Sequence, residues 1–202
     1  EIVPGVTSAI AAPAYAGIPV THRGLASHFT VISGSEDPTK ARSSVRWDML
    51  ARSGGTLVVL MGWAALESIL HTLQKEGMPA TSPVALVQWG TWPNQRVVTG
   101  TLADVASRGR EAGLEAPLVA IIGPVVALRD RLGWFDQRPL FGKKVLITRS
   151  RTQASRLRTL LVDLGAQPVE LPAIEIAPLE DYAKLDAVVG RLADFRWVIF
   201  SS

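Results

Sequence analysis

Cysteine is absent from this 202-residue sequence, and histidine occurs only three times. Without thiols, the chain can have no disulfide framework, cysteine-ligated zinc, iron–sulfur cluster or thiol catalysis. His22, His28 and His71 form neither an HExxH pair nor the histidine half of a zinc finger, so we expect no metal site. The absence of cysteine fits a reducing compartment, and we expect a cytoplasmic protein.

Long apolar segments are also missing. Leu57–Leu66 and Pro117–Leu128 are each interrupted by glycine, and both are shorter than the roughly 20 residues that a membrane-spanning helix needs. The alanine-rich stretch Ile10–Ala16 resembles a signal-peptide core, but no Lys or Arg precedes it and the sequence does not start with Met. We therefore interpret it as the interior of a soluble fold and expect no membrane association.

The charge is concentrated in the last third of the chain. Residues 1–137 carry 11 basic and 11 acidic side chains, whereas residues 138–202 carry 10 basic and 7 acidic ones, which accounts for the net charge of +3. The segment Arg138–Val162 holds seven basic residues and no acidic one. Such a block is either a solvated face or a surface that receives an anion. Nucleic-acid binding is disfavoured because aromatic residues are not interleaved with the basic ones.

Hydrophobic periodicity predicts alternating strands and helices. Thr56–Met61 has the length and β-branched character of a strand. Apolar residues at helical spacing follow from Trp63 to Leu73, and Gly77 and Pro79 mark the end of that helix. Further elements are predicted in chain order: a hairpin over Val84–Gln88 and Arg96–Thr99, a helix from a Thr101/Asp104 capping box to Gly113, a strand over Leu118–Ile122, a short helix over Val125–Leu132 and a joint over Asp136–Gly142.

A second pattern begins after this joint. Lys144–Thr148 and Gln167–Leu171 are predicted strands, and the apolar stripe between them predicts a helix that ends at Gly165. This β-α-β order implies a parallel sheet. A further helix around Leu185–Leu192 and a strand over Trp197–Phe200 follow, without room for a return helix, so we expect the chain to stop inside a domain. The predicted fold class is α/β: a mixed sheet with helices, followed by a partial flavodoxin-like parallel lobe.

The stretch from Val3 to Gly24 contains the most informative motif. Pro4-Gly5 favours a turn, and Thr7 or Ser8 can cap the small-residue helix that follows. A helix rich in alanine lets a backbone or a flat ligand approach closely. The residues alone leave two interpretations open, a ligand-binding loop and a packing motif.

This stretch closely resembles the central signature of uroporphyrinogen-III C-methyltransferases, in the tetrapyrrole methylase superfamily. Four more segments follow in that family's order and spacing: Gly55–Gly62, Gln88–Thr91, Gln95–Gly100 and Ala116–Gly123. The resemblance implies that residues 1–136 are the methylase carboxyl-terminal domain, without the amino-terminal half, and that residues 137–142 are a linker. It therefore implies a chain that by itself methylates nothing.

The same resemblance implies that S-adenosylmethionine lies in a cleft between two domains, held largely by backbone groups. The matching positions are Thr7, Ser8, Met61, Gly90 and Leu118. Their chemistry suits that role, because a thioether provides a soft apolar wall and glycine lets the main chain approach a nucleoside. An ordinary core methionine remains the alternative for Met61. The sequence departs from the family at Ser33-Gly34-Ser35 and at Pro124, so local contacts there are in question.

Arg23 is the candidate residue for the substrate, together with Thr21. Uroporphyrinogen III carries eight carboxylates, and a guanidinium group binds a carboxylate through two hydrogen bonds. The catalytic residue is not identified. His22 is a weak candidate for proton transfer, with a purely structural role as the alternative.

Residues 143–202 resemble the start of uroporphyrinogen-III synthase. The matching segments are Gly142–Arg149, Leu164–Ala166, Leu171–Ile176 and Trp197–Ser202. Ligands of α/β sheets bind beyond the carboxyl ends of strands, which places Thr148, Arg149 and Ser201 as candidates for substrate binding. Ordinary flavodoxin-like strand ends remain the alternative for these positions.

Together the two resemblances imply part of a bifunctional enzyme. The methyltransferase would use S-adenosylmethionine, without a metal, to convert uroporphyrinogen III into precorrin-2 for sirohaem or cobalamin biosynthesis. The synthase, a lyase, would cyclise hydroxymethylbilane. We expect a homodimer through the methylase domain. Another precorrin methyltransferase, and a non-catalytic binding or oligomerisation module, remain alternatives.

Overall fold

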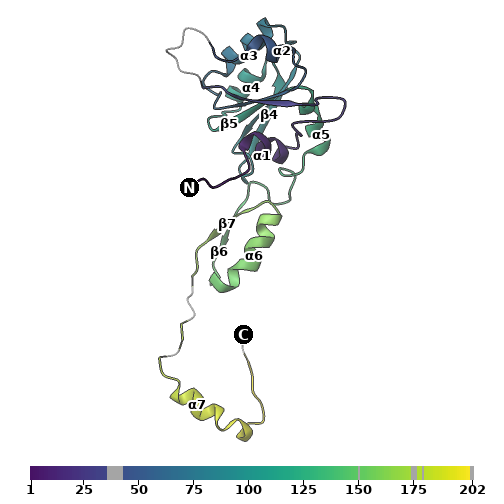
Figure 1. The fold of residues 1–202 in the computed structure, drawn as a ribbon. Coiled ribbons are helices and arrows are strands. Elements are labelled where there is room, and N and C mark those ends of the chain that lie inside the picture. The colour runs from purple at the N-terminus through teal and green to yellow at the C-terminus, as the bar shows by residue number, and fades with distance from the viewer. Residues whose placement is uncertain (36–42, 150, 174–176, 179, 201–202) are drawn as a thin grey trace.

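The computed structural model describes residues 1–35, 43–149, 151–173, 177–178 and 180–200. Its larger unit, the first unit, is built on a five-stranded mixed sheet (Figure 1). The strands are β1 (Phe29–Ser33), β2 (Thr56–Leu60), β3 (Pro83–Gln88), β4 (Arg96–Thr101) and β5 (Leu118–Ile122), in the spatial order β1-β2-β5-β3-β4. β1 and β2 are parallel, and every other neighbouring pair is antiparallel.

This pairing makes β1, β2 and β3 run in the same direction. Their carboxyl ends therefore meet at one edge of the sheet, beside the amino end of β5. We call this the carboxyl edge and define it by Gly34, Met61–Gly62, Trp89–Thr91 and Pro117–Leu118.

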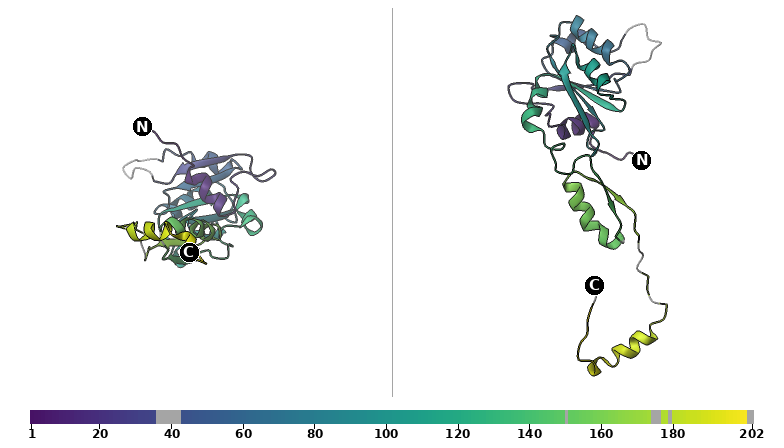
Figure 2. Two further views of the ribbon diagram at one scale, coloured as in Figure 1. Left: turned by 90° about the horizontal axis from the view of Figure 1, so that it is seen from below. Right: turned by 180° about the vertical axis from the view of Figure 1, so that it is seen from behind.

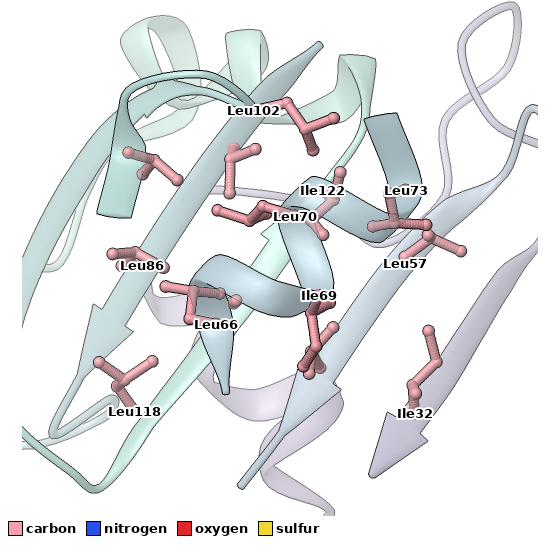
Figure 3. Close-up of a cluster of buried hydrophobic side chains, with 14 of the residues drawn as sticks. Ile32, Leu57, Leu66, Ile69, Leu70, Leu73, Leu86, Leu102, Leu118 and Ile122 are labelled. Atoms are coloured by element: carbon pink, nitrogen blue, oxygen red, sulfur yellow. The ribbon is translucent and has the colours of Figure 1, made fainter. Parts of the chain in front are cut away.

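Helices cover both faces of the sheet. One face carries α1 (Ser8–Tyr15) and the 3-10 helix η1 (Pro124–Leu128), which α5 (Arg129–Leu132) follows directly. The other face carries α2 (Trp47–Arg52), α3 (Leu66–Lys75) and α4 (Val105–Glu111). Side chains alternate between the faces, so that Leu86 joins one core and Val87 the other. In Figure 3, Leu70 and Leu73 of α3 lie over the strands that carry Leu57, Leu86 and Ile122. Burial on both faces explains why the central strands are continuously apolar.

Most of the elements predicted for this unit are present. β2, β3, β4 and β5, the helix α3 and the short helix after β5 match the predicted segments. β1 and α2 were not predicted. β1 is an edge strand whose Val31 is 46% exposed, and α2 has only six residues, so neither leaves a clear periodic signal.

The predicted capping box at α4 forms on one side only. The backbone N–H of Thr101 donates to Oδ1 of Asp104 at 2.6 Å, and the Thr101 hydroxyl donates to the same oxygen at 3.0 Å. The Thr101 side chain is thereby engaged with the carboxylate instead of capping a helical N–H. Arg108 also pairs with Asp104 at 2.8 Å, so this carboxylate organises the start of the helix.

This arrangement gives a pH-dependent prediction. The N–H of Thr101 lowers the pKa of the Asp104 carboxyl, and the Thr101 hydroxyl and Arg108 act in the same direction. A lowered native pKa adds stability above the ordinary pKa of aspartate, and that stability is lost as the pH falls through the native value. We expect Asp104→Ala to be less stable than the parent at pH 7 and the difference to shrink below pH 4, as measured by urea unfolding. Asp130→Ala, at an exposed carboxylate of α5, is the matched control; an unchanged Asp104 difference across this pH range would contradict the argument.

The second unit is a two-stranded parallel sheet with one helix. β6 (Lys144–Ile147) pairs with β7 (Gln167–Glu170), and α6 (Arg151–Asp163) connects them, as the β-α-β pattern predicted. Gly165 has a φ of +92°, which favours glycine at the turn after α6. α7 (Ala183–Val189) and the short η2 (Leu192–Asp194) lie apart from both sheets (Figure 2).

The strand predicted over Trp197–Phe200 is wrong. These residues have no regular secondary structure, and Ile199 and Phe200 are 86% and 89% exposed. A strand is held by hydrogen bonds to a neighbouring strand. Among the described residues, β6 and β7 pair only with each other, so the apolar pattern at 197–200 has no partner to order it.

The segment between the two units is packed against the first. The ring of Phe135 lies 4.8 Å from that of Tyr15 and 5.4 Å from that of Phe141, measured between centroids. The guanidinium carbon of Arg138 lies 4.6 Å from the ring centroid of Trp134. The domain boundaries at 136 and 142 stay a prediction, but the intervening residues make specific contacts.

Candidate functional site at the carboxyl edge

Sheet register brings three of the predicted cofactor residues together. Leu60 is paired with Val119, and Gln88 with Leu118, so the residues that follow β2 and β3 flank the start of β5. Met61, Gly90 and Leu118 therefore share the carboxyl edge although they are far apart in the sequence. Leu118 is buried, whereas the side chain of Met61 is 69% exposed.

The backbone at this edge is unusual. Met61, Trp89 and Thr91 have φ values of +54°, +50° and +75°, in the left-handed region that residues other than glycine rarely adopt. Each such residue costs on the order of 1 kcal/mol or more, and this strain is concentrated at functional sites in proteins. The turns after β2 and β3 thus point two large apolar side chains, Met61 and Trp89, toward the solvent.

Glycines let the turns after β1 and β2 touch. The N–H of Gly34 donates to the carbonyl of Leu60 at 2.7 Å. A Cβ atom at Gly34 would lie 2.4 Å from the Cα of Gly62. The departure from the family at Ser33-Gly34-Ser35 is local, and there the Ser33 hydroxyl donates to the carbonyl of Ser35 at 3.2 Å.

Helix α1 lies against this edge. Thr7 caps it as predicted, because its Oγ1 accepts the N–H of Ala9 at 3.2 Å. A Cβ at Gly90 would lie 2.5 Å from the Cβ of Ala12, so Gly90 is required for the contact. The Gln95 side chain donates to the carbonyl of Tyr15 at 3.3 Å, which places the carboxyl end of α1 at the β3–β4 loop.

Thr7 is the N-cap of α1 and Ser8 is its first residue, and α1 contacts both β5 and β2. Met61, Gly90 and Leu118 thus belong to the carboxyl edge, and Thr7 and Ser8 belong to the start of the helix that packs on Gly90. Their role in binding stays a prediction.

A hollow that the sequence did not indicate opens beside the edge. It has a volume of about 370 Å³ and lies between α3 and α4, with Trp63, Leu114 and Glu115 in its lining. Glu67 and Arg110 form an ion pair on its wall, and the hydrogen bond from Arg110 lowers the pKa of Glu67. The buried Gln88 side chain donates to the carbonyl of Glu115 at 2.8 Å, which connects the hollow to the end of β3.

The predicted substrate residues Thr21 and Arg23, and the candidate for proton transfer His22, are not at the carboxyl edge. They lie in the loop between α1 and β1, where His22 forms a bridge to Ala26. This loop leads into the amino end of β1, and a five-residue strand of about 16 Å separates the two edges. In Figure 1 the loop projects on the side of α5, away from the end of β1. Arg23 and Met61 thus lie at opposite edges of the sheet, and the role of Arg23 stays a prediction.

The candidate substrate-binding residues of the second unit are Thr148, Arg149 and Ser201. Thr148 and Arg149 are exposed directly after β6, at the carboxyl end of the parallel pair, as predicted. The carbonyl of Thr148 accepts the N–H of Ala173 at 3.0 Å. Ser201 lies outside the described residues.

The described residues provide neither a metal-binding cluster nor a membrane-spanning helix. They contain no group of three or more His, Cys, Asp or Glu side chains that could hold a metal ion. None of the helices formed by these residues has both the length and the apolar character needed to cross a membrane.

Comparison with known proteins gives matches in both units. The family model for tetrapyrrole (corrin/porphyrin) methylases matches residues 1–106, and the model for uroporphyrinogen-III synthase HemD matches residues 155–202. A porphyrin biosynthesis protein HemD of Ruminiclostridium josui is 36% identical over the whole chain, which covers 40% of that protein. An S-adenosyl-L-methionine-dependent uroporphyrinogen III methyltransferase of Methanosarcina barkeri is 51% identical over 66% of this chain and 52% of its own length.

A solved structure is also similar. It is the uroporphyrin-III C-methyl transferase from Thermus thermophilus complexed with S-adenyl homocysteine, with a TM-score of 0.50 and 35% identity over 63% of this chain and 54% of that one. The chain thus spans about half the length of these relatives, or less.

Proposed function

The chain belongs to the tetrapyrrole methylase family, and we propose that its first unit forms one wall of a site for S-adenosylmethionine-dependent C-methylation of uroporphyrinogen III. The convergence of Met61, Gly90 and Leu118 at a strained, partly apolar edge is the observation that carries this proposal. The fold similarity to a relative solved with S-adenyl homocysteine supports it.

The residues of this edge suit an adenosine group. Met61 presents an exposed thioether, which packs well against a flat ring. Gly90 lets the loop after β3 pack against Ala12 of α1, and the backbone N–H and C=O groups of this loop can contact the nucleoside. Thr7 and Ser8, at the start of α1, complete the set with hydroxyl groups.

The chemistry that such a site must perform is chiefly alignment. The sulfonium group supplies an already activated methyl group. The protein must hold the accepting carbon, the methyl and the sulfur in one line, and fixed positioning of this kind supplies much of the rate acceleration. A wall made of β-strand ends and a capped helix is rigid enough for that task, whereas a mobile loop is not.

We propose that Arg23 and Thr21 bind the carboxylates of the tetrapyrrole. Arg23 is exposed and its guanidinium can form the paired hydrogen bonds that a carboxylate accepts. His22 is the candidate for proton transfer. The homodimer through the methylase unit and the cytoplasmic location are parts of the proposal that rest on the family resemblance.

The second unit is proposed to be the beginning of a uroporphyrinogen-III synthase lobe, acting on hydroxymethylbilane without a cofactor. The family match over residues 155–202 and the parallel β6–β7 pair support this assignment. Thr148 and Arg149 would contact the substrate at the carboxyl end of β6. One polypeptide would then make uroporphyrinogen III and consume it, on a route to sirohaem or cobalamin.

The second unit and a binding test distinguish the proposed function from two alternative functions. A different precorrin methyltransferase would share the first unit, but the synthase match argues against it. A non-catalytic module would share the fold and would not bind the cofactor product S-adenosylhomocysteine.

Calorimetric titration with S-adenosylhomocysteine tests the proposal. The protein to titrate is this chain joined to the part of the Methanosarcina barkeri relative with which it does not align. We expect saturable binding, and we expect Met61→Ala to weaken it about tenfold because an apolar wall is lost. Met49→Ala is the matched control, since Met49 is a comparably exposed methionine on α2.

A glycine at position 61 provides a second readout. Met61→Gly relieves the left-handed strain, so we expect it to raise thermal stability while it weakens binding. If Met61→Ala and Met49→Ala bound S-adenosylhomocysteine with equal affinity, the carboxyl edge would not be part of the cofactor site. An absence of binding by every protein would favour the non-catalytic module.

A further inference from the structure

A second hollow lies where the two units meet, and neither proposed reaction uses it. This junction cavity has a volume of about 350 Å³, which is within the range of small-molecule sites. The first unit contributes Tyr15 and Trp92, and the segment between the units contributes Phe135. The second unit contributes Arg158 of α6 and Gln167 of β7. Figure 1 shows α6 and the start of β7 beneath the first unit.

One wall of the cavity is aromatic. Phe135 is 4% exposed, and it packs edge-on against Tyr15 and Phe141. These contacts hold the wall rigid. Trp92, in the β3–β4 loop, is 56% exposed and belongs to neither core of the first unit. A planar ring bound in the cavity would cover this indole.

The other wall is cationic. Arg138 stacks on Trp134 and donates to the carbonyl of Val162 at 3.3 Å, so its guanidinium is held in place. A Cβ atom at Gly165 would lie 2.8 Å from the Cβ of Arg138, so the glycine turn makes room for this arginine. Arg158 is the second guanidinium in the lining.

The lining residues include no acid. Outside the lining, Glu170 pairs with Arg158 at 3.2 Å. A guanidinium has five N–H donors, so one carboxylate leaves donors of Arg158 unused. Both arginines belong to the basic block Arg138–Val162, for which the sequence left open a solvated face and a surface that receives an anion.

We infer that the junction cavity binds a planar aromatic carboxylic acid, with its ring against Trp92 and its carboxylate on Arg138 and Arg158. Rings stack on an indole, and guanidinium groups bind carboxylates through paired hydrogen bonds. The inference is independent of the methylase proposal because the cavity shares no residue with the carboxyl edge except Thr91.

Calorimetric titration of the 202-residue chain with indole-3-propionate tests this inference. Indole-3-propionamide has the same ring without the charge, and propionate has the charge without the ring. We expect the aromatic acid to bind at least tenfold more tightly than either. Comparable affinity for the amide would overturn the role of the arginines, and comparable affinity for propionate would overturn the role of the aromatic wall.

Substitutions of lining residues test whether the ligand binds within the junction cavity. We expect Arg158→Gln and Trp92→Ala each to weaken binding of indole-3-propionate about tenfold. Arg156→Gln, on the same helix but outside the lining, is expected to change it less than twofold. Glu170→Gln is expected to strengthen binding about threefold, because it removes the carboxylate that competes for Arg158. Equal effects of Arg156→Gln and Arg158→Gln, or weaker binding by Glu170→Gln, would overturn the inference. Arg158 and Trp92 are both exposed, and thermal unfolding of each variant verifies that the fold is kept.

Discussion

Replacing Gly34 by alanine is expected to lower the free energy of unfolding of the first unit by about 3 kcal/mol, the largest effect that we predict for any added methyl group. The new Cβ would lie 2.4 Å from the Cα of Gly62, which is a backbone atom and cannot rotate away. The turns after β1 and β2 would have to separate. The hydrogen bond from the N–H of Gly34 to the carbonyl of Leu60 would be strained as well.

Two other glycines provide a graded comparison for this experiment. A Cβ at Gly62 would lie 2.7 Å from a Val59 methyl group, which belongs to a side chain, so Gly62→Ala is expected to cost about 1 kcal/mol. Gly5 has no atom within 4 Å of its added Cβ, so Gly5→Ala is expected to change stability by less than about 0.5 kcal/mol. Urea unfolding ranks the three variants. A Gly34→Ala protein as stable as Gly5→Ala would show that the two turns are not in contact.

Arg129→Met is expected to cost about 2–3 kcal/mol of unfolding free energy. The Arg129 guanidinium donates to the carbonyl of Ala16 and pairs with Asp136, and the two charged side chains are only 18% and 22% exposed. The substitution keeps much of the aliphatic length but leaves the Asp136 carboxylate and the Ala16 carbonyl without their donor. The end of α1 would then lose one of its connections to the aromatic segment that leads to the second unit, whereas the ring contact between Tyr15 and Phe135 would stay.

A neighbouring arginine and a double variant make this prediction specific. Arg131 is exposed on the same short helix, so Arg131→Met is expected to be close to neutral. Asp136→Asn removes the charge that Arg129→Met leaves unpaired, so the double variant should be more stable than the sum of the single effects predicts. Thermal or urea unfolding measures all four proteins. Strict additivity would mean that Arg129 and Asp136 do not act as a pair.

The elements predicted correctly are those whose signal is contained in a short window. β5, and β3 from Val84 onward, are buried on both faces, so each is a mainly apolar run bounded by turn residues. α3 has its buried residues Leu66, Ile69, Leu70 and Leu73 at helical spacing, which the sequence displays directly. The parallel β6–β7 pair followed from the β-α-β order of the predicted elements.

The missed strand and the wrongly predicted strand depend on neighbouring strands that lie outside any short stretch of sequence. β1 is a strand because β2 lies beside it, and Trp197–Phe200 is not a strand among the described residues because no neighbour pairs with it. The same limit applied to the substrate candidates. Arg23 is the candidate for the substrate and Met61 for the cofactor, and the sheet separates them by the length of a strand.

The sequence by itself determined the strands and helices that have a clear local pattern, the family they resemble and the residue types available for chemistry, because side-chain spacing and backbone preference act over a few neighbouring positions. Only the tertiary structure decided that Met61, Gly90 and Leu118 meet at one edge, that Arg23 lies at the other, and that Arg138 and Arg158 line one cavity. The physical reason is that strand order, register and the packing of the two units are set by contacts between residues far apart in the chain, whose energies no single segment contains.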